Sequence, residues 1–107
     1  KNWIPFTYEG QVHFVYRPSP HTVVRCGLDG ACELVGRPQA FPPLQGLERQ
    51  GYEVRGSGQA VLIDDAEATP NLPHRHYLAL LHVVSLDPRS SGYAHFAYRF
   101  MAEPPFA

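Results

Sequence analysis

The chain has 107 residues, of which nine are lysine or arginine, ten are aspartate or glutamate and 44% are hydrophobic. This length suits one small domain that buries roughly 60–70% of the surface of its unfolded chain. A net charge of −1 gives no general attraction for nucleic acid or anionic membranes, and no apolar run approaches the roughly 20 residues of a membrane span. We therefore expect neither a nucleic-acid partner nor a membrane partner.

The first group of predicted strands lies within residues 1–35. Residues 11–17 alternate between two faces, as a half-buried strand does, and prolines follow them. Residues 21–26 are rich in β-branched side chains, and residues 32–35 come after a glycine-containing turn. The last two segments predict a β-hairpin.

The two cysteines, Cys26 and Cys32, stand at the facing ends of this hairpin. They are too few for a disulfide framework or for a zinc site built of cysteine alone. A single disulfide across the hairpin and two separate thiols both remain open, because the sequence does not define the redox compartment.

A proline-rich stretch, residues 36–50, follows the hairpin. It contains Pro38, Pro42, Pro43 and Gly46, which interrupt regular structure. We predict a long surface connection here.

The second group of predicted strands occupies residues 51–107, with strands at 52–55, 60–64, 76–84 and 93–101. Segment 76–84 is nearly continuously apolar, so we expect both of its faces to be covered. Its β-branched residues, its length and the turn residues on each side favour a strand over a helix.

These elements predict an all-β fold with two groups of about three antiparallel strands. Two such groups have the rhythm of neighbouring blades in a β-propeller. A β-sandwich of six or seven strands is the alternative. The sequence begins at Lys1 without a methionine and ends abruptly in Pro-Pro-Phe-Ala, so we expect a piece of a longer protein, which favours the propeller.

Several histidines and acidic residues could carry chemistry. His74 and His76 would share a face of an extended segment, as two metal ligands do, but a solvated loop is the favoured interpretation. His82 lies within an apolar strand, where an imidazole is either a hydrogen-bonded core residue or part of a cavity. Asp64, Asp65 and nearby Glu67 are interpreted as a solvated acidic loop rather than a catalytic pair.

A glycine-rich turn follows Arg55 in the sequence Arg-Gly-Ser-Gly. Glycines let backbone N–H groups approach an anion, and a guanidinium offers two parallel donors to phosphate or carboxylate. The turn lacks the spacing of a nucleotide-binding loop, and we find no motif for a serine or cysteine nucleophile or for a metal. We therefore predict no cofactor.

Together these segments resemble the five-bladed β-propeller mannoside phosphorylases and mannosidases of glycoside hydrolase family 130. The resemblance consists of Lys-Asn-Trp-Ile-Pro-Phe at 1–6, Tyr-Arg-Pro at 16–18, the glycine-rich turn at 55–57 and Tyr-Leu-Ala-Leu-Leu-His-Val-Val at 77–84, followed by Tyr93. It covers most of the chain in short patches whose order and spacing match.

The resemblance implies a site that binds a mannose-type glycan, with inorganic phosphate beside it in the phosphorylases. The residues implied in substrate or phosphate binding are Lys1, Tyr16, Arg17, Arg55 and His82. Tyr16 stands where the family has histidine, which makes water or another acceptor an alternative to phosphate. The family's catalytic aspartate would precede Lys1, so we expect the isolated chain to be inactive.

Three hypotheses follow. The first is part of a carbohydrate-active propeller that acts by hydrolysis, phosphorolysis or glycosyl transfer. The second is a glycan-binding or scaffold protein on the same fold without catalysis. The third is an unrelated secreted β-sandwich that is cross-linked by a disulfide between Cys26 and Cys32.

Overall fold

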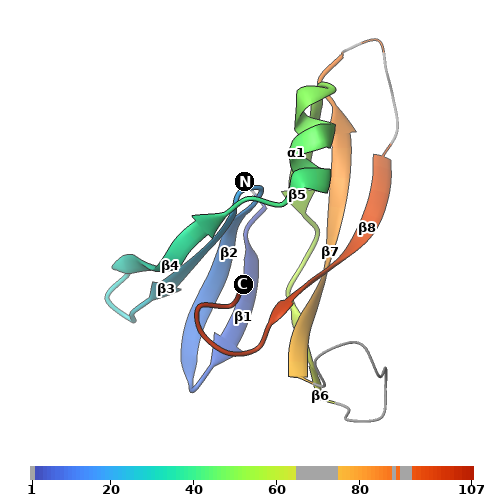
Figure 1. Cartoon of the computed structure of the whole chain (residues 1–107). Coiled ribbons are helices and arrows are strands. Elements are labelled where there is room, and N and C mark those ends of the chain that lie inside the picture. The colour runs from blue at the N-terminus through green and yellow to red at the C-terminus, as the bar shows by residue number, and fades with distance from the viewer. Residues whose placement is uncertain (1, 65–74, 88, 90–92) are drawn as a thin grey trace.

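A computed structural model describes residues 2–64, 75–87, 89 and 93–107 of the chain. The described part forms eight β-strands and one short α-helix, arranged as two antiparallel sheets of four strands each (Figure 1). The predicted all-β class is confirmed. Two such sheets are compatible with two neighbouring blades and also with the sandwich alternative.

The first sheet is a meander in which each strand pairs with the next along the chain. Its order is β1-β2-β3-β4, one strand more than predicted, because residues 4–8 also form a strand. Glu9 and Gly10, with φ of 48° and 74°, form the tight turn between β1 and β2. The four strands are β1 (Ile4–Tyr8), β2 (Gln11–Pro18), β3 (His21–Cys26) and β4 (Cys32–Gln39).

The connection predicted over residues 36–50 lies largely at the surface, but it contains regular structure that the sequence did not indicate. Strand β4 continues to Gln39, and helix α1 (Pro42–Arg49) follows it. Proline is tolerated at the first helical positions, where the backbone N–H has no partner within the helix. Leu44 is buried and Leu47, almost one turn later, packs partly buried against the same core, so tertiary packing stabilises this short helix.

The second sheet is built around the long strand β7 (Arg75–Ser85). Strand β8 (Tyr93–Met101) pairs with one edge of β7. Strands β5 (Tyr52–Gly56) and β6 (Val61–Asp64) lie end to end along its other edge. Between them the N–H of Ser57 donates to the carbonyl oxygen of Leu80 over 2.9 Å, which keeps this turn attached to β7.

One face of β7 is fully buried and the other is only partly covered, contrary to the expectation that both faces of segment 76–84 are covered. Tyr77, Ala79, Leu81 and Val83 are buried, whereas Leu80 is 54% exposed. The buried side faces the first sheet, because Tyr77, Ala79 and Leu81 share a core cluster with strands of that sheet. The other face, which carries His82, is more open.

The core lies where the two sheets face one another. Phe6 of β1 is at its centre, with its ring 4.7 Å from the ring of Tyr77 and 5.1 Å from that of Phe100. The N–H of Ala60 also donates to the carbonyl oxygen of Pro5 over 2.9 Å, a direct backbone link between the sheets. Side chains and backbone thus join the two sheets into one body.

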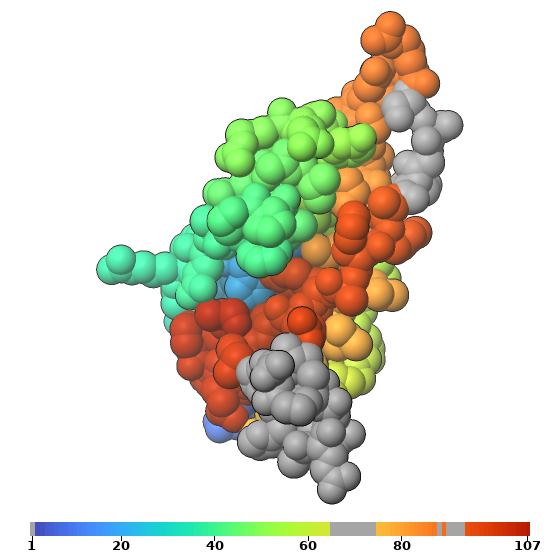
Figure 2. All heavy atoms as spheres, turned by 45° about the vertical axis from the view of Figure 1, so that its right-hand side comes forward, coloured from blue at the N-terminus to red at the C-terminus, as the bar shows by residue number. Residues whose placement is uncertain are grey.

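The C-terminal segment closes this core. Figure 2 shows it on the same face of the molecule as β4 and α1. Phe106 is fully buried, and its carbonyl oxygen lies 2.6 Å from Nε2 of His21. Nδ1 of His21 contacts the hydroxyl of Tyr98. Burial lowers the pKa of His21, so the neutral ring donates to Phe106 and accepts from Tyr98.

Cys26 and Cys32 form a disulfide with their Cα atoms 4.1 Å apart. The two residues are direct partners across β3 and β4, so the bond closes the hairpin at its turn. The structure thus settles the choice that the sequence left open. The described residues contain no helix long and apolar enough to cross a membrane.

Candidate functional site

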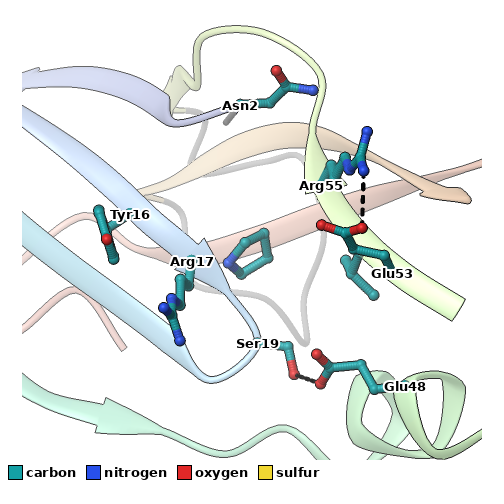
Figure 3. Close-up of a pocket in the computed structure, with 9 residues that line it drawn as sticks. Asn2, Tyr16, Arg17, Ser19, Glu48, Glu53 and Arg55 are labelled. Carbon is teal, nitrogen blue, oxygen red and sulfur yellow. Dashed lines mark hydrogen bonds and ion pairs between the residues drawn. The ribbon is translucent and has the colours of Figure 1, made fainter. Parts of the chain in front are cut away.

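A polar pocket of about 430 Å³ opens where the end of β2, strand β5 and helix α1 meet (Figure 3). We call it the β2–β5 pocket. It is lined by Asn2, Tyr16, Arg17, Pro18, Ser19, Glu48, Glu53, Val54 and Arg55.

Charged side chains of both signs face this pocket. An Nη atom of Arg55 donates to a carboxylate oxygen of Glu53 over 2.8 Å, and the hydroxyl of Ser19 donates to Glu48 (Figure 3). The guanidinium of Arg17 lies 5.5 Å from the centre of the Tyr16 ring, within the range of a cation–π contact. The pocket therefore offers guanidinium donors beside carboxylate acceptors.

An aromatic cluster borders the pocket. The ring of Trp3 lies 5.0 Å from that of Tyr16 and 5.2 Å from that of Phe14, both edge to face. Trp3 is 37% exposed. Because Tyr16 also lines the pocket, apolar ring surface adjoins its charged groups.

A second pocket, of about 510 Å³, lies beside the first on the open side of β7 and shares Asn2 with it. We call it the histidine pocket. Nδ1 of His82 is 2.8 Å from the hydroxyl oxygen of Ser57. The remaining lining residues are Gly56, Gly58 and His95.

The structure brings three of the five predicted binding residues together. Tyr16, Arg17 and Arg55 share the β2–β5 pocket, whereas His82 lies in the adjoining histidine pocket. Lys1 lies outside the described residues. The roles assigned to these residues remain predictions.

The solvated-loop interpretation is wrong for His76, whereas Asp64 is solvent-exposed at the end of a strand. His76 belongs to β7 and is only 8% exposed. Asp64 ends β6 and pairs with Arg75 at 3.5 Å. His74, Asp65 and Glu67 lie outside the described residues. Within the part that is described, no three metal-ligating side chains form a group.

Sequence reasoning missed four polar residues of the β2–β5 pocket: Asn2, Ser19, Glu48 and Glu53. Glu53 stands two residues before Arg55 in a predicted strand, and side chains at that spacing share a face, so this pair was within reach of the sequence. Glu48 could not be predicted in this way, because it lies on helix α1, and the prolines of that segment had indicated a loop.

No protein-family model, no curated protein and no solved structure matches the chain.

Proposed function

We propose that the β2–β5 pocket binds a mannose-type glycan, and that the chain belongs to a carbohydrate-active β-propeller protein. The observation that carries this proposal is the Glu53–Arg55 pair in a cleft beside exposed aromatic surface. Sugar hydroxyls both donate and accept hydrogen bonds, so a guanidinium beside a carboxylate can bind two neighbouring hydroxyls. Trp3 and Tyr16 offer ring surface for the apolar C–H face of a sugar.

The fold supports the same proposal. Two consecutive antiparallel sheets packed against each other are compatible with neighbouring propeller blades. The resemblance to mannoside-active propellers gives the sugar class. In the whole protein we propose hydrolysis, phosphorolysis or glycosyl transfer, with Arg17 and Arg55 as candidate ligands for inorganic phosphate.

The alternative is a glycan-binding propeller without catalysis. It is favoured by Tyr16, because a phenol cannot become cationic as the family's histidine can. The two possibilities differ in whether the protein has an aspartate in the position of the family's general acid, which would indicate an enzyme. Both predict that the 107-residue chain binds a glycan without turning it over.

A titration tests the binding proposal. We expect β-1,4-mannobiose to shift the amide resonances of residues around the β2–β5 pocket in ¹H–¹⁵N spectra. Arg55→Ala should weaken binding by about 10–100-fold, because a hydrogen bond to a charged group contributes about 1.5–3 kcal/mol. Arg89→Ala is the matched control, since Arg89 pairs with Asp87 outside both pockets.

Two results would contradict the proposal: no shift with millimolar mannobiose, or equal affinity in the Arg55→Ala and Arg89→Ala variants. Shifts caused by phosphate alone, without any sugar response, would indicate an anion site in place of a glycan site.

A further inference from the structure

Two histidines face each other across the open side of the second sheet. His82 of β7 and His95 of β8 are direct register partners, so their side chains emerge on the same face of neighbouring strands. Their ring centres are 6.3 Å apart. Both rings line the histidine pocket.

Ser57 contacts one of the two ring nitrogens of His82. Nδ1 of His82 lies 2.8 Å from the Ser57 hydroxyl. A histidine that binds a metal commonly directs its other ring nitrogen to such a partner, which sets the tautomer and orientation of the ring. In the tautomer whose Nδ1–H donates to Ser57, Nε2 of His82 carries the lone pair.

Exposure separates these two histidines from the others that the structure describes. His13, His21 and His76 are only 2%, 7% and 8% exposed. His82 is half-buried at the wall of the pocket, and His95 is exposed. The pair is therefore positioned to meet a solute.

A cation stands on the neighbouring strand, because Arg55 of β5 is the register partner of His82. Its guanidinium pairs with Glu53 at 2.8 Å and lines the other pocket. The Glu53 carboxylate offsets this positive charge, so it does not prevent a second cation from binding near His82.

We propose that His82 and His95 form a two-histidine site for a late first-row divalent metal ion, such as Zn²⁺ or Cu²⁺. Metal–imidazole bonds are about 2.0–2.1 Å long, so one ion can bridge rings whose centres lie up to about 6.4 Å apart. A tetrahedral angle at the ion needs a separation of about 5 Å, which rotation of the exposed His95 side chain supplies. Water completes the coordination, and the open pocket leaves space for it.

The experiment titrates the tag-free, full 107-residue chain with ZnCl₂ and, separately, CuSO₄, by isothermal calorimetry. We expect one equivalent of metal to bind, with higher affinity for Cu²⁺ than for Zn²⁺. Mg²⁺ should give no heat of binding, because imidazole is a ligand for late transition metals rather than for Mg²⁺. His82→Ala and His95→Ala should each weaken Zn²⁺ binding at least about tenfold. The Cu²⁺ complex should show hyperfine coupling to two imidazole nitrogens in its electron paramagnetic resonance spectrum.

His74→Ala is the control, because His74 and His76 are the other histidines that the sequence offers as a pair of metal ligands. It should leave Zn²⁺ binding unchanged. Ser57→Ala should weaken binding about tenfold and Ser57→Thr should restore it, as expected for a positioning residue that acts through His82. His95 is exposed, so its variant keeps the fold even where His82→Ala does not.

Three results would overturn the proposal: unchanged Zn²⁺ affinity in the His95→Ala variant, loss of binding in the His74→Ala variant, or a copper spectrum without imidazole coupling. Inorganic phosphate that shifts both histidine rings, with no response to Zn²⁺, would also overturn it in favour of an anion site. No sugar enters this test, so its failure is distinguishable from failure of the glycan proposal.

Discussion

Gly56 of β5 lies against the N-terminal segment whose Asn2 lines both pockets. A Cβ atom added there would lie 2.5 Å from Cγ1 of Ile4 and 2.6 Å from the carbonyl oxygen of Asn2. Separations this short are repulsive, and one of the two contacts is backbone. Glycine therefore lets the N-terminal segment pass close to β5 and places Asn2 between the two pockets.

We predict that Gly56→Ala lowers the free energy of unfolding by about 1–3 kcal/mol, the usual cost of overpacking. It should also weaken glycan binding, because Asn2 is displaced. Urea denaturation and the mannobiose titration measure the two effects.

Gly46→Ala is the matched control. It lies within helix α1, where nothing comes within 4 Å of an added Cβ atom. Alanine should stabilise the chain by about 0.5–1 kcal/mol, because glycine is the poorer helix former. Equal effects of the two substitutions would show that the contact with Ile4 and Asn2 has no energetic weight.

A disulfide cross-links the two strands of the β3–β4 hairpin. Cys26 and Cys32 are six positions apart, and the chain-entropy model gives about 2 kcal/mol for closing so short a loop. We predict that replacing both with serine lowers the free energy of unfolding by about that amount. Denaturant titration with and without dithiothreitol checks it.

Reduction of the native chain should reproduce the stability of the double-serine variant, while dithiothreitol should leave that variant unchanged. The glycan affinity should stay the same, because neither cysteine lines the β2–β5 pocket. A folded state that is equally stable without the bond would contradict the prediction.

The strands that were predicted correctly from the sequence are those whose own residues show the pattern of a strand. Residues 11–17 alternate and residues 21–26 are β-branched, and both segments are strands. Helix α1 was missed because its two prolines and its glycine suggest a loop, whereas packing of Leu44 against the core decides the outcome. Local propensity predicts a short helix poorly when the helix is stabilised mainly by the packing of one buried side chain.

The candidate site was predictable to the same extent. Tyr16, Arg17 and Arg55 come from predicted strands, and the structure places all three at one pocket. Glu48 required the unpredicted helix, and the nearness of His95 to His82 required the register of β7 with β8. Such juxtapositions depend on long-range pairing, which periodicity along the chain does not specify.

The C-terminal segment packs against both sheets and so connects them. It leaves β8 of the second sheet and brings Phe106 against the first. The Phe106 ring lies 5.2 Å from that of Phe6, 5.1 Å from that of Tyr8 and 5.3 Å from that of His13. The N–H of Met101 also donates to the carbonyl oxygen of Ala107 over 2.9 Å, which folds the segment back on itself.

We predict that Phe106→Ala lowers the free energy of unfolding by about 3–5 kcal/mol, as truncation of a fully buried aromatic side chain does. Small domains have about 5–15 kcal/mol in total, so the variant should be close to unfolding at physiological temperature. Phe96→Ala is the control, because that ring is 44% exposed on β8 and its loss should cost far less. Thermal unfolding followed by circular dichroism measures both variants. Equal melting temperatures would mean that the two sheets hold together without the C-terminal segment, and that the interface centred on Phe6 and Tyr77 suffices.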